Sequence, residues 1–365
     1  MNLALTEEQV ALRYLARTIL QDLVTQDRLR QAEAGPDRFD AGLWAELARA
    51  GLLGVTVPES HGGMGGGLLE ACLLLEEQGR TVAPVPLLPT VVLGAMPIAR
   101  FGTERQRDLL LRGVPAGDAV LTAALQPDGG PPPIEAGRTE AGWVLEGVVQ
   151  AVPAATRAAA LLVPAGTPDG VRGFLVNGAH ATLEEQPVTT HEPRFRVTLD
   201  AVAGEPLGED GAPELHDWLA PRAVVAACAL QVGVCERALR LTAEYVTGRE
   251  QFGRPLGSFQ AVQQRLADAY VDVEVMRWAM WQAAWRLDEG LPAAEEVAVA
   301  KAWAAEGGQR VVAAAQHLHG GIGVDVEYPL HRYTLWAKDL ELWLGSANRH
   351  LARLGDLLAD SEVTA

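Results

Sequence analysis

Apolar residues recur at helical spacing over both ends of this chain. Between Val262 and Leu287 they advance in alternating steps of four and three, which places them on one stripe of a single helix about thirty residues long. A helix of that length needs long partners, and an antiparallel four-helix bundle supplies them. We expect those partners over residues 215–248, 292–318 and 330–360.

The first third of the chain is also helical by pattern. Thr6, followed by Glu8 and Gln9, predicts a capped helix start. Further helices are expected over residues 39–53, 68–80, 91–101 and 104–111. The segment 57–67 contains too many glycines for a helix or a strand, so we expect a loop there.

The pattern changes to short apolar runs separated by Gly, Pro and Asp between residues 119 and 208. Arg194 to Leu199 alternates as a half-buried strand does, and the other runs cover 143–145, 159–163, 173–176 and 181–183. We therefore predict a mainly helical α+β protein of three domains. These are an N-terminal helical domain (1–118), a middle β domain (119–208) and a C-terminal four-helix bundle (209–365).

Composition narrows the possible partners and compartments. The chain has 47 acidic and 30 basic residues and a net charge of -17, which disfavours nucleic acid and anionic membrane surfaces. The three cysteines lie in apolar helical patterns and indicate buried thiols of a reducing cytoplasm, so we assign no disulfide and no metal site. We expect a cytoplasmic protein without a signal peptide, and no apolar run that approaches the length of a membrane span.

Two C-terminal motifs carry the most specific pattern. Arg249-Glu-Gln-Phe-Gly253 lies between two predicted helices, and Gln316-His-Leu-His-Gly-Gly-Ile-Gly323 ends the third helix of the predicted bundle. They resemble the paired signatures of the acyl-CoA dehydrogenase family. The segments Val57-Pro-Glu-x-x-Gly-Gly-x-Gly and Leu75-Glu-Glu-x-Gly resemble that family too. All these motifs follow one another in the same order as in the family, and together they extend along essentially the whole chain. The resemblance implies that family's fold and the FAD-dependent α,β-dehydrogenation of an acyl-CoA thioester.

In that family the two motifs lie together at a subunit interface and hold the adenosine diphosphate half of FAD. A guanidinium such as that of Arg249 suits the pyrophosphate, because it binds phosphate oxygens bidentately. The alternative for Arg249 is an ordinary interface ion pair. The resemblance implies these cofactor-binding residues: Arg249, Gln251, Phe252, Gln260, Gln263, His317, Gly320, Gly321, Ser346 and Asn348.

The family's catalytic base is missing at both places where it is expected. That base is a Glu before Gly-Thr near the chain end or at the start of the first bundle helix, and those positions hold Leu344 and Ala223. Neither side chain accepts a proton, so we assign no catalytic residue. Glu341, one turn before Leu344, is the fallback candidate. Other carboxylates on or beside the first bundle helix are more often solvated charges: Asp217, Glu244 and Glu250.

The flavin-ring motifs of the family are also eroded. Where members have Thr-Glu-Pro-x-x-Gly-Ser-Asp this chain has Leu125-Gln-Pro-Asp-Gly-Gly-Pro-Pro132, and Ala151-Val-Pro-Ala154 replaces Trp-Ile-Thr-Asn. Leu125, Pro131 and Pro153 have no hydroxyl, and proline has no amide hydrogen to donate. The ring side of this chain's own FAD site is therefore predicted to be poor.

Three interpretations remain open. The favoured one is the base-lacking subunit of a hetero-oligomer that binds FAD across a subunit interface with a catalytic sister subunit. The resemblance then implies an acyl-CoA substrate, bulky or branched, a homo- or hetero-oligomer such as a tetramer, and electron-transferring flavoprotein as electron acceptor. The second is a self-sufficient dehydrogenase with Glu341 as relocated base, and the third is a non-enzymatic scaffold subunit. Flavin content and the activity of the isolated chain separate them.

Overall fold

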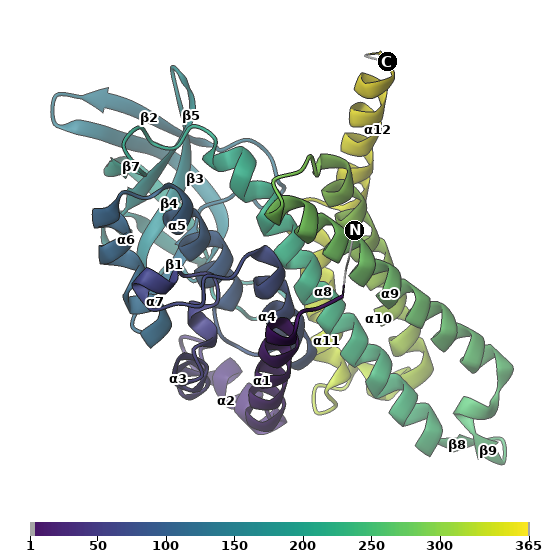
Figure 1. Cartoon of the computed structure of the whole chain (residues 1–365). Helices are drawn as coiled ribbons and strands as arrows, with labels where there is room; N and C mark the ends of the chain where they lie inside the picture. The colour runs from purple at the N-terminus through teal and green to yellow at the C-terminus, as the bar shows by residue number, and fades with distance from the viewer. Residues whose placement is uncertain (1–3, 364–365) are drawn as a thin grey trace.

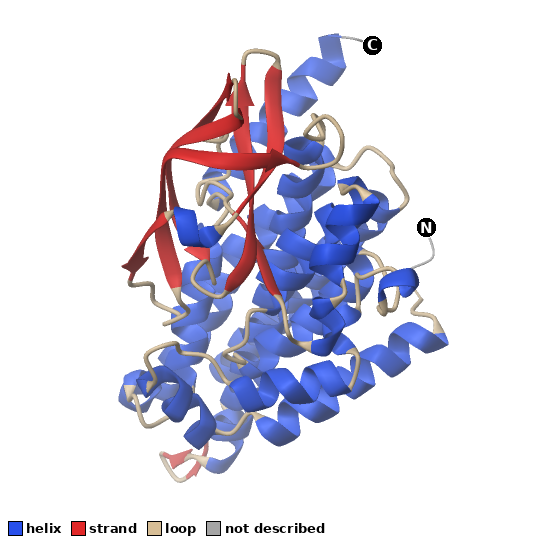
Figure 2. Ribbon diagram, turned by 90° about the vertical axis from the view of Figure 1, so that its left-hand side faces the viewer, coloured by secondary structure: helices blue, strands red, loops and turns tan. Residues whose placement is uncertain are grey.

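Helices form both ends of the chain, and a β domain lies between them (Figure 1). The computed structural model describes residues 4–363; the outermost ends of the two predicted helical domains, residues 1–3 and 364–365, lie outside the described residues. The predicted α+β fold class is confirmed. Figure 2 shows the strands gathered on one side of the helices, with one small hairpin far from them. Domain boundaries near residues 118 and 208 stay a prediction.

The N-terminal helices begin where the sequence places its caps. The Thr6 hydroxyl accepts a hydrogen bond from the amide of Gln9, whose side chain accepts one from the amide of Thr6, as predicted. The predicted helix over residues 91–101 is confirmed; it begins three residues earlier as π-helix η3 (Leu88–Ala95) and continues as α5. Two helices, α2 and the short α7, were not predicted. The helices are α1 (Glu7–Leu23), α2 (Gln26–Ala34), α3 (Ala41–Arg49), α4 (Leu68–Thr81), α5 (Met96–Phe101), α6 (Glu104–Leu111) and α7 (Gly113–Ala116), with 3-10 turns η1 (Leu52–Gly54) and η2 (Glu59–His61).

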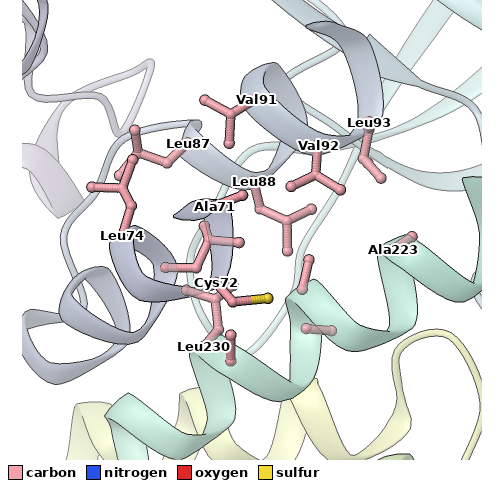
Figure 3. Close-up of a cluster of buried hydrophobic side chains, with 14 of the residues drawn as sticks. Ala71, Cys72, Leu74, Leu87, Leu88, Val91, Val92, Leu93, Ala223 and Leu230 are labelled. Carbon is pink, nitrogen blue, oxygen red and sulfur yellow. The ribbon is translucent and has the colours of Figure 1, made fainter. Parts of the chain in front are cut away.

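Helix α4 joins the N-terminal helices to the bundle by packing directly against α8 (Leu215–Gly248). A Cβ atom at Gly79 would lie 2.2 Å from the carbonyl oxygen of Leu230, so only glycine allows these two backbones to touch. Around this contact, Figure 3 shows Ala71 and Cys72 of α4 packed between η3 and α8. All three cysteines are free and buried, as predicted. Burial raises the pKa of Cys72 well above its ordinary value and that of Cys228 to about 11.

The middle domain is a seven-stranded sheet that closes on itself. Its strand order is β1-β4-β2-β3-β7-β5, and β5 also pairs with β4, while β6 pairs with β7. A separate apolar core fills it, with Phe174, Val163 and Leu145 fully buried. The sequence pattern did not predict β1 and β2. The strands are β1 (Val120–Ala123), β2 (Ile134–Thr139), β3 (Gly142–Pro153), β4 (Ala158–Thr167), β5 (Gly170–Val176), β6 (Thr182–Gln186) and β7 (Arg194–Pro206), with 3-10 turn η4 (Gly178–His180).

The C-terminal bundle follows the predicted helices except at its last member. The single helix expected over 330–360 is wrong, because the chain turns at Leu344 (φ 62°) and Gly345 (φ 101°) and forms two helices. Besides α8, the bundle comprises α9 (Gln260–Asp288), α10 (Ala294–His319), α11 (Leu330–Leu342) and α12 (Ala347–Val363). Hairpin β8 (Glu250–Gln251) and β9 (Arg254–Pro255), with 3-10 turn η5 (Leu256–Ser258), joins α8 to α9, and η6 (Gly320–Val324) follows α10.

Helix α8 is long and apolar enough, by length and composition, to cross a membrane. This corrects the expectation that no apolar run approaches that length. In the folded protein, however, 83% of its most apolar window is buried against the other helices. The apolar character of α8 is therefore explained by its central place in the core.

Candidate functional site

The turn between α11 and α12 carries Leu344, which stands where the resemblance described above implies a catalytic base. Leu344 is buried and has a left-handed backbone, which costs a non-glycine residue about 1–2 kcal/mol. Its amide donates a 2.7 Å hydrogen bond to the carbonyl oxygen of Pro127, and its carbonyl oxygen lies 2.9 Å from Nε2 of His350. The turn is thus held from two sides, and its side chain offers no proton acceptor.

Two buried basic side chains hold this turn. Lys301 of α10 donates a hydrogen bond of 2.5 Å from Nζ to the carbonyl oxygen of Leu340, in the last turn of α11. Burial lowers the pKa of Lys301. Burial also lowers the pKa of His350 to about 4, and the hydrogen bond to Leu344 offsets this only in part. His350 is therefore neutral at pH 7 and donates from Nε2 to the Leu344 carbonyl. Both residues act here as hydrogen-bond donors to the backbone.

The segment that should hold a flavin ring instead packs on the turn. Pro127 accepts the Leu344 amide, and Asp128 forms an ion pair of 2.9 Å with Arg349 of α12. Gly129 lies so close that a Cβ atom there would be 3.0 Å from the Leu344 carbonyl oxygen. The cavity left between this segment, the start of α8 and the turn has a volume of about 40 Å³. Pockets for drug-sized ligands measure about 300–1,000 Å³, so neither a flavin ring nor an acyl chain fits.

The fallback base lies beside the turn but is already paired. Glu341 of α11, whose side chain is 20% exposed, forms a 2.8 Å ion pair with the half-exposed Lys338 on the same helix. A general base in this chemistry has to be poorly solvated and directed at the substrate. Ser346 and Asn348, two predicted cofactor ligands, lie just past the turn, where Asn348 is exposed at the start of α12.

The remaining predicted FAD ligands come together at the other end of the bundle. Arg249 ends α8, and hairpin β8–β9 follows it with Gln251 and Phe252 exposed at its surface. Gln260 and Gln263 open α9, where Gln263 donates 3.0 Å to the carbonyl oxygen of Gly257. Among the residues that the structure describes, no side-chain partner of Arg249 is found. Its guanidinium is exposed and available to an anion.

The end of α10 lies beside the end of α8. The ring of His319 stacks on that of Tyr245 at 4.4 Å and bonds to the Tyr328 hydroxyl at 3.0 Å. Directly after it, Gly320 turns the chain with φ 64°, and no atom lies within 4 Å of a Cβ built at Gly320 or Gly321. The backbone of this turn is open to close approach by a ligand, as an anion site requires. His317 is exposed on the last turn of α10.

The two groups of candidate residues are too far apart to serve one molecule. The cavity beside Leu344 is lined by Pro221 near the start of α8, whereas Arg249 lies at its end. At about 1.5 Å per residue, the helix between them spans about 40 Å. Figure 1 shows the same separation, with β8 and β9 at the opposite end of the bundle from α12. That distance exceeds the length of one FAD molecule.

Comparison with known proteins places this architecture in a family. The profile for the acyl-CoA dehydrogenase N-terminal domain matches residues 6–118, and that for the C-terminal domain matches residues 221–358. The acyl-CoA dehydrogenase FadE27 of Mycobacterium tuberculosis is 40% identical over 99% of this chain and all of its own length. The chain belongs to the acyl-CoA dehydrogenase family.

Two solved structures of related proteins are similar over almost the whole chain. A variant of the Tcur3481-Tcur3483 steroid ACAD is 48% identical with a TM-score of 0.92, over 98% of this chain and 99% of its own. The ChsE4-ChsE5 complex from Mycobacterium tuberculosis is 40% identical with a TM-score of 0.93, over the same shares. Both similarities extend over all three parts of the fold.

The chain fits the FAD of acyl-CoA dehydrogenases at one end only. At the end of the bundle that carries hairpin β8–β9, here called the hairpin end, Arg249 offers a guanidinium without a side-chain partner among the described residues, and Gly320-Gly321 offer an open turn; both suit a pyrophosphate. At the opposite end, around Leu344, the segment from Leu125 to Pro132 offers no hydroxyl for a flavin ring, and the remaining cavity has a volume of about 40 Å³. This region is here called the ring end. The residues present could therefore hold the diphosphate half of FAD but not its ring.

A buried ion pair near the turn was missed by the sequence reasoning. Arg194 of β7 is buried, bonds to Asp339 of α11 at 2.5 Å, and lies 4.7 Å from the ring centre of Trp343. It ties the middle domain to the helix that carries the turn. The alternating run gave no signal for this burial, because Arg194 shares the face of Arg196 and Thr198, opposite the apolar side chains of the run.

Proposed function

We propose that this chain is the base-lacking subunit of a hetero-oligomeric acyl-CoA dehydrogenase. In this proposal its hairpin end contributes Arg249, Phe252 and the Gly320-Gly321 turn to an FAD molecule whose ring is held by a catalytic sister subunit. The observation that carries it is that the residues around Leu344 and those around Arg249 lie at opposite ends of α8. The space at the Leu344 end, where a flavin ring would lie, is filled by the chain's own residues.

Surface composition at the hairpin end supports a covered interface. Phe252 is 88% exposed, and Val324 and Val326 are each 66% exposed. Aromatic side chains are enriched at protein interfaces, so the exposed ring of Phe252 supports a contact with a partner in this proposal. An aromatic residue such as Phe252 is a typical interface anchor because its burial stabilises the complex without a polar cost.

The chemistry assigned to the sister subunit follows from what this chain lacks. The reaction removes an α proton by a carboxylate base while FAD accepts the β hydride. Here Leu344 and the buried Ala223 occupy the two base positions, and Glu341 is engaged by Lys338. The sister subunit should therefore carry Glu before Gly-Thr in the turn that corresponds to Leu344 and Gly345.

The relatives suggest the substrate class. One similar structure is described as a steroid ACAD, and the other is a complex of two named proteins. We propose a steroid or similarly bulky acyl-CoA thioester as the substrate of the assembly. A tetramer built as a dimer of dimers, a cytoplasmic location and electron-transferring flavoprotein as electron acceptor complete the proposal.

The test compares the isolated chain with the assembly. The full chain is purified alone and with a sister subunit that carries the Glu, and FAD is quantified by absorbance. Anaerobic flavin bleaching is then recorded with butyryl-CoA and with a steroid side-chain CoA thioester. We expect no retained flavin and no bleaching from the lone chain, and both from the assembly with the steroid thioester.

Two outcomes would contradict the proposal. Bleaching by the lone chain that is abolished by Glu341→Gln, but not by Glu140→Gln at an exposed site of the middle domain, would establish Glu341 as a relocated base. An assembly that forms but contains no flavin would establish a scaffold role.

A further inference from the structure

A histidine and two carboxylates meet between the glycine-rich loop 57–67 and helix α6. Nε2 of His61 lies 3.5 Å from Oδ1 of Asp108 and 3.7 Å from Oε1 of Glu104. The three ligand-type atoms all lie within 4.8 Å of one another. Glu104 and Asp108 are one turn apart on α6, so their side chains project from the same face of the helix.

His61 is placed as a ligand residue is placed. Its side chain is only 4% exposed, and Nε2 has no hydrogen-bond partner although it points at the two carboxylates. The other ring nitrogen, Nδ1, lies 2.9 Å from the Ser60 hydroxyl. When Nδ1 donates to Ser60, the lone pair of Nε2 faces the carboxylates, which is the arrangement of a metal-binding imidazole with a fixed ring.

The loop that presents His61 is rigid. Gly62 has a left-handed backbone (φ 86°), and a Cβ atom at Gly63 would lie 2.0 Å from the carbonyl oxygen of Val57. Backbone hydrogen bonds fold the loop onto the preceding turn, among them Met64 to Gly54 at 2.9 Å. His61 is therefore held in place before any ligand binds, which lowers the entropic cost of binding.

We propose that His61, Glu104 and Asp108 form a binding site for a divalent metal ion of the zinc type. Zinc binds nitrogen and oxygen at about 2.0–2.2 Å, so two ligands at a tetrahedral angle are separated by about 3.4 Å, close to the distances seen here. Imidazole together with carboxylates suits Zn²⁺ better than Mg²⁺ or Ca²⁺, which prefer oxygen ligands alone. Water completes the coordination, because both carboxylates are at the surface. This proposal departs from the sequence interpretation, which assigned no metal.

Neighbouring charges affect the site in a way that can be tested. Oδ1 of Asp108 also accepts two hydrogen bonds from Arg112, whose side chain is 61% exposed, and Arg107 lies 3.5 Å from Glu104. An ion must displace Arg112 from this oxygen, which costs little for an exposed pair. The ion would brace loop 57–67 against α6. The amides that follow this loop, of Leu68 and Leu69, bond to Asp288 at the end of α9.

Zinc titration of the full chain tests the site. Chain freed of metal with EDTA is titrated with ZnCl₂ by calorimetry, and we expect one ion per chain at this site. Glu104→Gln and Asp108→Asn, both at the surface and compatible with folding, should each weaken zinc binding about tenfold or more, since even outer-shell changes cost 10- to 100-fold. His61→Ala should abolish it, whereas Arg112→Ala should tighten it. Co²⁺ should give visible d–d absorption that these ligand variants lose.

Matched controls keep the result interpretable. Glu59→Gln removes a carboxylate from the same turn as His61, and His180→Ala removes an exposed histidine of the middle domain; both should bind zinc as the wild type does. Saturating zinc should raise the melting temperature of the wild type but not of Glu104→Gln. The proposal is overturned if zinc does not bind, or if it binds equally to the wild type, Glu104→Gln and Asp108→Asn.

Discussion

At the scale of single residues, the turn at Leu344 concentrates the contacts that close the ring end. A leucine in the left-handed region is stable only when its surroundings hold it there. Three donors and acceptors from separate parts of the chain do so: the Pro127 carbonyl, the His350 ring and, one turn earlier, Lys301. Backbone hydrogen bonds therefore hold Leu344 in place, and its side chain offers no group for acid–base chemistry.

Gly345 tests how tightly the turn is packed. Its φ of 101° is unfavourable for any L side chain, and a Cβ atom would lie 2.8 Å from Nε2 of His350. We expect Gly345→Ala to lower the free energy of unfolding by about 1–3 kcal/mol. Gly355→Ala is the control, because no atom lies within 4 Å of a Cβ there and its φ is ordinary. Urea unfolding of both variants measures the difference, and equal midpoints would refute the tight turn.

His350 should make the protein sensitive to acid. Its pKa is about 4 in the folded chain against an ordinary 6.5, so between these values the unfolded chain binds the extra proton. Stability from this group is therefore full above pH 6.5 and is lost as the pH falls towards 4, by up to about 1.4 kcal/mol per pH unit. Replacing it by Gln, which can still donate to Leu344, should flatten this slope in urea unfolding curves. The exposed His180→Gln variant should keep it; an unchanged slope in His350→Gln would contradict the assignment.

At the scale of elements, buried ion pairs join α4, α8 and α9 beside the glycine contact. Arg277 of α9 bonds to Glu76 of α4 at 3.0 Å and also to Glu236 of α8, while Arg80 pairs with both of those carboxylates. Glu76 is 1% exposed, so its charge is stable only with these partners. The cluster fixes how the N-terminal helices sit against the bundle.

Removing one cation of this cluster should be costly. Arg277→Met leaves buried carboxylates with only Arg80 to compensate them, and we expect a loss of about 3 kcal/mol in the free energy of unfolding. Arg49→Met breaks a pair with Glu46 in which the arginine is 70% exposed, and it should lower the free energy of unfolding much less than Arg277→Met does. Both values come from urea unfolding. A loss of similar size in the two variants would show that the cluster contributes no more than a surface pair.

Helices were more predictable than strands for a physical reason. The periodic stripe of α9 and the length of α8 are local properties, and their predicted extents agree with the structure to within about two residues. Strand β1 is buried on all four residues, so it shows no alternation, and β2 follows three prolines. The break in the last helix depends on the left-handed Leu344 and its contact with Pro127, which is distant in the sequence.

At the scale of the whole molecule, part of the site was visible in the sequence and part was not. The lack of a carboxylate at Leu344 and of hydroxyls at Leu125 and Pro131 follows from residue identity alone. The small size of the cavity beside Leu344 could not be predicted from residue identity, because it arises from packing between the middle domain and α12. The Leu344 turn and Arg249 lie at opposite ends of the bundle because α8 runs the whole distance between them.

Arg249 tests the proposed role of the hairpin end in the assembly. Its guanidinium has no side-chain partner among the described residues, so its loss should leave the stability of the isolated chain unchanged. In the assembly, Arg249→Ala should weaken FAD retention by about 1.5–3 kcal/mol, as expected for a charge-assisted contact. Arg138→Ala, which removes the same charge from the distant middle domain, should retain flavin as the wild type does. The measurement is the flavin-to-protein ratio of each assembly after gel filtration. Equal ratios in the two variants would show that Arg249 has no part in cofactor binding. Selective loss of flavin in Arg249→Ala would locate the diphosphate at this end of the bundle.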